Sequence, residues 1–351
     1  MIDLRSDTVT MPSREMLETA LWARLGDDGR RRADRTGGDP TVDRLEQLAA
    51  DLTGKEAALF FPTGTMANTA ALSSACGPGD RVLIDPLLHM YVSEKVAFHP
   101  QFLRLEPVFY RLDGDHMPDV ADIRDKLEQT GAKMVCVENT HNFSGGSCTT
   151  PQRLAEVAEA AHQRGALVHM DGARLFNAAT ALGVEARELC RPVDTVMFCL
   201  SKGLGAPAGS LLCGGAERIA ACREQRKLLG GGMRQSGVLA APGIHALEHN
   251  RQRLAEDHDN ARAFAQAVAA AVKSVRVVEP RTNIVLLDLA ESGIDGKVFS
   301  ARLEERGVLA HLVPGHVRLT FHLGISREDA IEAARAVIET AEGGAHGTGG
   351  V

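Results

Sequence analysis

Two apolar runs of this chain each end in a short turn that carries one charged side chain. Residues 167–170 lead into Asp171, and residues 195–200 lead into Lys202, which lies on a turn of small residues. Short apolar runs that end in such turns are typical of buried strands, and parallel strands need a crossover, usually a helix, between them. The chain is therefore expected to fold as strands that alternate with helices around a sheet.

The same alternation continues on both sides of these two runs. Further apolar runs lie at residues 57–61, 81–85, 134–138 and 209–214, and helical patterns lie at 151–164 and 217–229. This rhythm predicts an α/β fold with a doubly wound, mostly parallel sheet, whose active residues lie at the carboxyl ends of the strands. The run at 209–214 follows the preceding run so closely that it could instead pair antiparallel.

The C-terminal third predicts a second, smaller unit. After a long helical stretch at 236–272, strands are expected at 275–279, 282–289 and 317–322, and helices at 296–306 and 327–342. This pattern predicts a small C-terminal α+β domain, and a chain of 351 residues can bury one large core and a smaller one.

The predicted organisation has four parts. We expect an N-terminal arm at 1–20 that contributes to the active site, a large cofactor domain at 21–250, a small domain at 251–342 and a disordered tail at 343–351. The tail is glycine-rich and has too little apolar surface to offset its ordering entropy.

Lys202 and Asp171 together indicate carbonyl chemistry. A lysine that is held among small residues and partly desolvated stays neutral often enough to form an imine. A carboxylate that ends another strand is the partner that the protonated ring nitrogen of pyridoxal 5′-phosphate (PLP) requires. Each turn alone is more typical of a surface lysine or of a turn that ends a strand.

A third element makes the set more specific. The run at 57–61 breaks at Pro62 and Gly64 and then leads into an Ala-rich helical stretch. Free N–H groups at that helix start, with the hydroxyl of Thr65, form an anion site suited to a phosphate, although such turns are also common as plain helix caps. The phosphate site, the acid and the lysine, in this order, predict a PLP site.

Four longer segments of the chain then point to a family. They lie at 2–10 (IDLRSDTVT), 138–142 (ENTHN), 171–178 (DGARLFNA) and 230–237 (GGGMRQSG). With them the chain resembles the low-specificity L-threonine aldolases, from its first residues to about Asp329. This resemblance implies a fold-type I, PLP-dependent transferase-like structure, in the group that also holds the β-eliminating lyases.

The resemblance implies roles for individual residues. Lys202 would bind PLP covalently, Asp171 would bond the pyridine nitrogen, and Arg174 would lie near the ring's 3′ oxygen and the substrate. His89 matches the histidine that stacks on the ring, and a neutral imidazole there is a candidate for proton transfer with the substrate hydroxyl. These four residues are the expected catalytic set.

The other implied residues bind the phosphate and the substrate. Gly64, Thr65 and Ser201 would hold the phosphate, and Arg234 would reach a phosphate across a subunit interface. The protein would then be a homo-oligomer with shared active sites, a dimer or a tetramer built as a dimer of dimers. Four residues would bind the substrate, namely Ser6, His89, Arg174 and Arg318. Of these, Ser6 and Arg318 would hold its carboxylate, and arginine suits this task because its planar fork binds a carboxylate at two points.

The activity that the resemblance implies is retro-aldol cleavage of a β-hydroxy-α-amino acid, such as L-threonine or L-allo-threonine, to glycine and an aldehyde. β-Elimination, racemisation and transfer of a glycine carbanion to another aldehyde use the same lysine and aspartate, so these reactions stay open. A non-catalytic scaffold is the more remote alternative, because buried charged side chains cost stability when no charged ligand pairs with them.

Three segments depart from the family pattern. The family's Val-Tyr-Gly-Asp-Asp-Pro stretch is replaced at 26–40 by a longer segment without tyrosine and with arginines between Arg30 and Arg35. The family's histidine segment ahead of Glu138 has no counterpart. Ser93 stands where the family often has an aromatic residue, which predicts a preference for a side chain larger or more polar than a methyl group.

Composition excludes several classes of partner. A net charge of -7 and a pI near 6.0 argue against a nucleic-acid partner. No run approaches the roughly 18 apolar residues of a membrane span, and no signal peptide is recognisable, so a cytoplasmic protein is expected. The seven cysteines show no C-x-x-C spacing, which indicates reduced, buried thiols rather than disulfides or a metal site.

Overall fold

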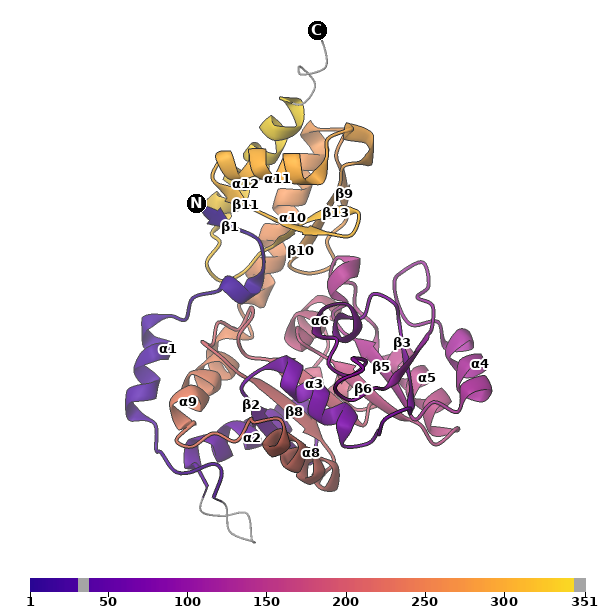
Figure 1. The fold of residues 1–351 in the computed structure, drawn as a ribbon. Helices are drawn as coiled ribbons and strands as arrows, with labels where there is room; N and C mark the ends of the chain where they lie inside the picture. Colours follow the sequence, from indigo (N-terminus) through magenta and orange to yellow (C-terminus); the bar gives the residue numbers. More distant parts are fainter. Residues whose placement is uncertain (31–37, 344–351) are drawn as a thin grey trace.

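The computed structural model describes residues 1–30 and 38–343, so most of the tail expected at 343–351 and part of the arginine-rich segment lie outside the described residues. A larger lobe holds a seven-stranded sheet, and a smaller lobe with a four-stranded sheet lies against it (Figure 1). Helix α10 (Leu254–Ala271) leads from the larger lobe into the smaller one.

The large sheet is almost entirely parallel. Its strands, in spatial order, are β2 (Ala57–Phe61), β8 (Ser210–Gly214), β7 (Thr195–Cys199), β6 (Leu167–Asp171), β5 (Met134–Glu138), β3 (Arg81–Ile84) and β4 (Glu106–Phe109). Only β8 runs against its neighbours β2 and β7. The predicted doubly wound, mostly parallel sheet is therefore confirmed, and the run at 209–214 pairs antiparallel. The sequence analysis missed β4, an edge strand that contains Pro107 and buries little of its surface.

Helices cover both faces of this sheet. One face carries α2 (Pro40–Thr53), α4 (Val120–Thr130), α5 (Pro151–His162), α6 (Leu175–Leu182) and α7 (Ala186–Cys190), and the other carries α3 (Gly64–Ser73) and α8 (Ala216–Leu228). Because side chains alternate along a strand, Val135 and Val137 of β5 pack in the first layer, and Met134 and Cys136 pack in the second. Burial on both faces explains why these strands are continuous apolar runs.

The small lobe is built on an antiparallel sheet. Its strands, in spatial order, are β12 (His311–Val313), β13 (His316–Thr320), β10 (Ile284–Asp288) and β9 (Arg276–Val278). Helices α10, α11 (Gly296–Glu305) and α12 (Arg327–Glu342) pack on it around one apolar cluster.

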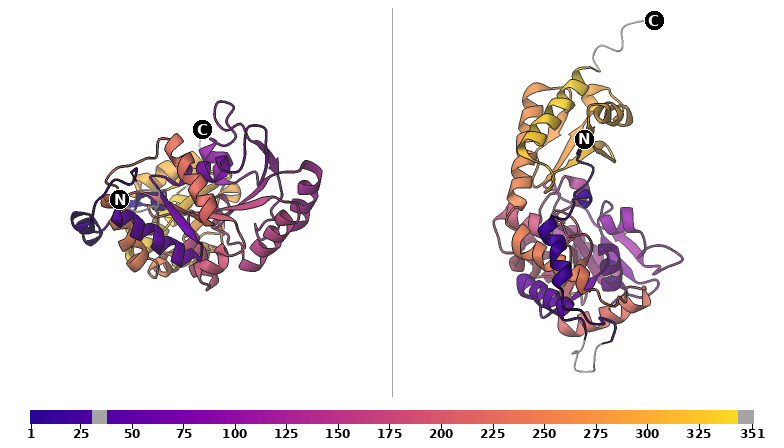
Figure 2. Two further views of the ribbon diagram at one scale, coloured as in Figure 1. Left: turned by 90° about the horizontal axis from the view of Figure 1, so that it is seen from below. Right: turned by 90° about the vertical axis from the view of Figure 1, so that its left-hand side faces the viewer.

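The N-terminal segment connects the two lobes. Strand β1 (Ile2–Asp3) pairs with β11 (Val308–Leu309) in the small lobe. The chain then passes through the short helix η1 (Asp7–Val9) and descends along the side of the molecule as α1 (Arg14–Thr19) (Figure 2). This path carries residues 6–10 past the junction of the lobes.

One prediction of secondary structure was wrong. The stretch at 236–272 is not one helix but α9 (Gly237–His245), a π turn η5 (Ala246–Asn250) and α10. Pro242 within α9 cannot donate a helical hydrogen bond, and the wider π turn follows shortly after it.

The cysteines and the length of the helices bear on two expectations for the whole chain. All seven cysteines are free, and all but Cys148 are buried. Among the helices of the described residues, none combines the length and the apolar character that crossing a bilayer requires.

Candidate active site

A cavity of about 260 Å³ lies where the carboxyl ends of the large sheet meet the N-terminal segment and the small lobe. All but one of the residues predicted for the site line it. They are Ser6, Gly64, Thr65, His89, Asp171, Arg174, Ser201, Lys202 and Arg318. Most of them come together because parallel strands end at one edge of the sheet. Strand β13 of the small lobe adds Arg318.

Arg234 is the exception. Its side chain is 64% exposed, and its nearest described acid is Asp27, at 3.7 Å between Nη1 and Oδ1. The backbone N–H of Asp28, in the part of the 26–40 segment that the structure describes, donates to the carbonyl of Arg234. Within one chain, Arg234 does not line the cavity.

Asp171 and Lys202 share the cavity because they follow neighbouring strands. Asp171 ends β6 and is 1% exposed, and its Oδ1 accepts the N–H of Ala173 at 3.0 Å. Lys202 follows the end of β7, and no described residue accepts a hydrogen bond from its amine. The acid is therefore held in place, and the amine is left without a fixed partner.

The start of α3 faces the same cavity. Thr63 caps the helix by accepting the N–H of Met66 at 3.2 Å, and the N–H groups of Gly64 and Thr65 have no acceptor among the described residues. A Cβ on Gly64 would lie 3.2 Å from the sulfur of Cys199, so a larger residue there would require that side chain to shift. Free N–H groups at a helix start suit an anion.

His89 follows β3 and is held at both its backbone and its ring. Its N–H donates to Oε2 of Glu138 at 2.8 Å, and its Nδ1 lies 3.3 Å from Oε1 of Glu94. Burial opposes the positive charge on His89, but the hydrogen bond to Glu94 and the charges of Asp171 and Glu138 outweigh it and raise the pKa of the ring. The neutral imidazole predicted from the sequence is therefore less favoured than in a free histidine.

The wall predicted from Ser93 needs correction. Ser93 is exposed and does not line the cavity, whereas the next residue, Glu94, does. The predicted preference for a larger side chain therefore loses its structural basis.

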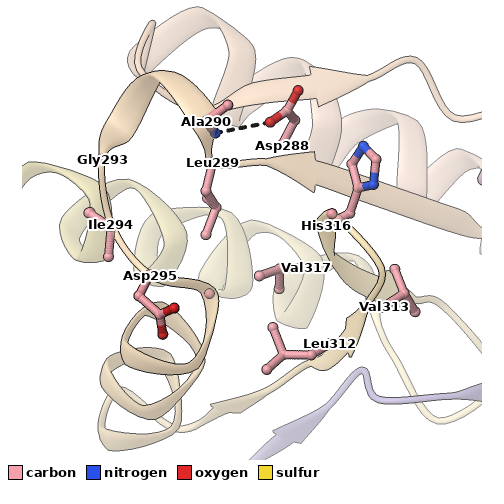
Figure 3. Close-up of a pocket in the computed structure, with 12 residues that line it drawn as sticks. Asp288, Leu289, Ala290, Gly293, Ile294, Asp295, Leu312, Val313, His316 and Val317 are labelled. Carbon is pink, nitrogen blue, oxygen red and sulfur yellow. Dashed lines mark hydrogen bonds between the residues drawn. The ribbon is translucent and has the colours of Figure 1, made fainter.

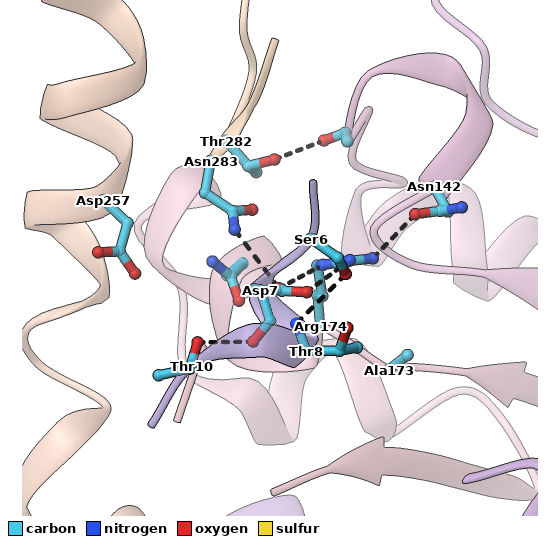
Figure 4. A network of polar contacts seen from close by, with 12 residues as sticks. Ser6, Asp7, Thr8, Thr10, Asn142, Ala173, Arg174, Asp257, Thr282 and Asn283 are labelled. Atoms are coloured by element: carbon cyan, nitrogen blue, oxygen red, sulfur yellow. Dashed lines mark hydrogen bonds and ion pairs between the residues drawn. The ribbon is translucent and has the colours of Figure 1, made fainter. Parts of the chain in front are cut away.

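Two arginines lie side by side at the top of the cavity. Nε and Nη2 of Arg174 donate to the two carboxylate oxygens of Asp7, at 2.7 and 2.8 Å (Figure 4). Nη1 of Arg174 and Nη1 of Arg318 both donate to Oδ1 of Asn142, at 3.1 and 2.9 Å. Nε of Arg318 is buried without a described partner. An unfilled donor on a buried guanidinium pair is suited to a carboxylate.

The charges of this group are strongly perturbed. Burial alone would raise the pKa of Asp7, but the charge and hydrogen bonds of Arg174, with Lys202 and Arg318, lower it to about 2. Burial and the neighbouring Arg174 lower the pKa of Arg318 to about 10. Arg318 therefore stays charged at neutral pH, next to a second cation.

The sequence analysis assigned no role to several residues of the site. They are Asp7, Asn68, Glu94, Glu138 and Asn142. Three of them stand inside quoted motifs, but an acid or an amide in a motif has no pattern that shows what it binds. The one signal that could have indicated these residues is that they stand close in the sequence to a residue predicted for the site.

One cluster of the described residues could hold a metal ion, whereas the sequence analysis expected none. Ligand atoms of His89, Glu94 and Asp171 lie within 4.8 Å of one another. However, the amide nitrogen of Asn68 donates to both carboxylates, so an N–H donor already occupies the position that a cation would need.

A larger hollow of about 500 Å³ opens in the small lobe (Figure 3). Asp288 there accepts the N–H of Ala290 and pairs with Arg276, and Asp295 caps α11. The predicted site residues lie elsewhere, so this hollow is not the candidate active site.

Comparisons with known proteins agree with this geometry. The model of the β-eliminating lyase family matches residues 3–292. The low specificity L-threonine aldolase of Escherichia coli K12 is 41% identical over 338 residues, which cover 95% of this chain and 97% of that protein. The low-specificity L-threonine aldolase 1 of Arabidopsis thaliana is 38% identical over 346 residues, which cover 93% of each chain.

Solved structures share the fold. The threonine aldolase of Leishmania major has a TM-score of 0.80 and 18% identity, with 97% of this chain and 100% of that chain covered. A putative L-allo-threonine aldolase of Listeria monocytogenes has a TM-score of 0.76 and 21% identity, with 97% and 96% covered. At these identities the likeness shows the fold alone.

Proposed function

The chain belongs to the β-eliminating lyase family, in its low-specificity threonine aldolase group, and from this premise we propose that it cleaves a β-hydroxy-α-amino acid, such as L-threonine or L-allo-threonine, to glycine and an aldehyde. The observation that carries the proposal is the shared cavity of Lys202, Asp171 and the Arg174–Arg318 pair. An amine, an acid and a carboxylate site in one cavity are the groups that this reaction requires.

The residues present fit PLP as the cofactor. Lys202 would hold its carbonyl carbon, Asp171 its ring nitrogen, and the N–H groups of Gly64 and Thr65, with Ser201, its phosphate. When bound, PLP withdraws electrons from the substrate Cα.

The arginine pair would orient the substrate. Arg318 has a buried Nε without a partner and lies beside Arg174, and Ser6 lines the same side. A carboxylate held at two points restricts rotation about the substrate Cα, so it determines which bond faces the cofactor. The arginine pair therefore contributes to the selection of the Cα–Cβ bond as the bond that breaks.

His89 is our proposed base for the substrate hydroxyl. When Nδ1 donates to Glu94, Nε2 of the neutral ring carries a lone pair that can accept the hydroxyl proton. Loss of this proton lets the carbonyl of the aldehyde form as the Cα–Cβ bond breaks. The charged ring can return a proton later, and Glu94 would stabilise that charged state.

Product identity tests the reaction. Purified protein with PLP and L-threonine is expected to yield glycine and acetaldehyde, measured by amino-acid analysis and by an aldehyde-reducing coupled assay. Pyruvate and ammonia would instead support β-elimination. A Lys202→Ala variant is expected to lose both turnover and the visible absorbance of bound PLP, and retention of both would overturn the role of Lys202.

We also propose a homo-oligomer, a dimer of dimers with shared active sites. Arg234 lies outside the cavity of its own chain, which supports its action on a neighbour's phosphate site. Large apolar side chains of the N-terminal segment are exposed in the single chain. They are Met11, Leu17, Leu21, Trp22 and Leu25. Several large apolar side chains exposed along one segment are typical of an interface.

We further propose that the protein works in the cytoplasm. Its seven free cysteines suit a reducing compartment. The acidic net charge of -7 supports a small-molecule substrate rather than a nucleic-acid partner.

A further inference from the structure

A hydrogen-bonded series of buried polar side chains runs from within the large sheet to two carboxylates of the cavity. Oγ1 of Thr195 lies 2.8 Å from Nδ1 of His169, and Nε2 of His169 lies 3.0 Å from Oδ1 of Asn68. Nδ2 of Asn68 lies 3.0 Å from Oδ2 of Asp171 and 3.1 Å from Oε1 of Glu94. Except for Glu94, none of these residues is more than 2% exposed.

One arrangement of protons gives every side chain of this series a suitable donor or acceptor. Carboxylates accept hydrogen bonds, so the amide nitrogen of Asn68 must face Asp171 and Glu94, and its oxygen must face His169. Nε2 of His169 therefore carries a proton and donates it. Burial lowers the pKa of His169 to about 4, so the ring is neutral, and Nδ1 accepts from the Thr195 hydroxyl.

The alternative orientation of the amide is unfavourable. It would place the oxygen of Asn68 against two carboxylates, and its N–H groups against the protonated Nε2 of His169. The two carboxylates thus determine which face of the amide points into the cavity, and His169 and Thr195, which lie on neighbouring strands, hold its oxygen in that orientation.

We propose that Asn68 is a positioning residue that holds the carboxylates of Asp171 and Glu94 apart and in fixed orientations, and that His169 and Thr195 hold its amide in place from the other side. Because the proposed function assigns Asp171 to the PLP ring and His89 to the substrate hydroxyl, this inference rests on that function. The amide of Asn68 then positions Asp171 directly and His89 through Glu94, because Glu94 bonds the ring of His89.

The physical need for such a donor follows from the geometry. Ligand atoms of Glu94 and Asp171 lie within 4.8 Å of each other, and two negative charges at this distance repel each other. The two N–H groups of Asn68 can bond one carboxylate each and so offset this repulsion. An ionised Asp171 is the form that pairs with a protonated pyridine nitrogen.

The test measures PLP binding rather than turnover. Asn68→Leu keeps the size of the side chain but removes the donor and the acceptor. Its dissociation constant for PLP, measured by equilibrium dialysis of the apoprotein, is expected to rise about 10- to 100-fold, as for loss of one hydrogen bond to a buried charge. The visible spectrum of bound PLP is expected to shift, because the partner of the ring nitrogen, Asp171, loses the hydrogen bond that orients it.

Thr195→Val covers the case in which Asn68→Leu does not fold. It is nearly isosteric and bonds no carboxylate of the site, but it removes the hydroxyl that donates to Nδ1 of His169 and so loosens the support of the Asn68 amide. A rise of a few-fold in the PLP dissociation constant is expected. The control is Asn260→Leu, which removes a buried amide that donates to the carbonyl of Ile325 in the small lobe, and its PLP affinity is expected to equal that of the wild type.

The outcomes separate this inference from the proposed function. If the wild type binds PLP and the folded Asn68→Leu and Thr195→Val variants bind it with the wild-type affinity and spectrum, the positioning role is wrong and the proposed function stands. If Asn260→Leu weakens PLP binding as much as Asn68→Leu does, the effect is general destabilisation and the inference fails. If the wild type itself does not bind PLP, the proposed function fails first.

Discussion

Asp7 is the residue that allows two arginines to lie together in a buried site. Its carboxylate is fully buried and meets the guanidinium of Arg174 at two points, and Arg318 lies on the far side of Asn142. The three side chains carry one net positive charge. A substrate carboxylate at Arg318 would neutralise it.

This arrangement predicts a pH-dependent contribution of Asp7 to stability. Its pKa is about 2 when folded and near 3.8 when unfolded, so the contribution is present above pH 4 and is lost as the pH falls from about 4 to 2. The size is about 2 kcal/mol. We expect Asp7→Asn to lower the thermal midpoint clearly at pH 7, and the difference from the wild type to shrink as the pH approaches 3. A difference that does not depend on pH would contradict the ion pair.

Asn142 gives a second prediction at this scale. Its amide oxygen is the acceptor between the two guanidinium groups. Asn142→Asp would place a charged carboxylate there, and this would compete with the substrate carboxylate. We expect KM for the amino acid, and the dissociation constant of glycine, to rise about 10-fold, with a smaller change in kcat. Unchanged glycine binding would show that the arginine pair does not bind the carboxylate.

At the scale of elements, the ends of the strands determine the site. Glu138 at the end of β5 accepts the N–H groups of His89 and Asn142, at 2.8 and 2.9 Å, and so joins the turns after two neighbouring strands. Helix α3 begins directly after β2 and directs its first N–H groups into the same cavity. The ends of these strands and helices therefore contribute backbone N–H groups to the site as well as side chains.

The start of α3 can be tested with a matched pair of caps. Thr63 caps α3 and Thr150 caps α5, each by accepting the N–H of the residue three positions on, at 3.2 Å. Thr63→Ala and Thr150→Ala are each expected to cost about 1 kcal/mol of stability. Only Thr63→Ala is expected to weaken PLP binding, measured by dialysis, because only α3 would hold the phosphate. Equal PLP affinities in the two variants would argue against the phosphate site.

At the scale of the molecule, the site depends on parts that are distant in the sequence. The large sheet supplies Asp171 and Lys202, the N-terminal segment supplies Ser6 and Asp7, and β13 of the small lobe supplies Arg318 (Figures 1 and 2). Movement of the small lobe relative to the large one would therefore change the carboxylate site but not the cofactor site.

The proposed shared site predicts complementation between subunits. Lys202→Ala and Arg234→Ala homo-oligomers are each expected to be nearly inactive. After mixed refolding, a hybrid pair has one site with both wild-type residues, so statistical mixing is expected to restore about a quarter of the wild-type activity. The assay is aldehyde formation, and light scattering gives the size of the assembly. Activity that does not rise on mixing would place Arg234 in its own chain's site or in none.

By itself, the sequence determined the alternation of strands and helices, the turn residues Gly64, Asp171 and Lys202, and the family, because these follow from patterns among near neighbours and from long motifs. It did not predict the break at 246–253 or the exposed position of Ser93. Only the tertiary structure decided that Asp7 pairs with Arg174, that Asn142 joins Arg318 and that His169 orients Asn68. These partners lie more than a hundred positions apart, and hydrogen bonds act over about 3 Å, so the order of strands and the docking of the small lobe select them.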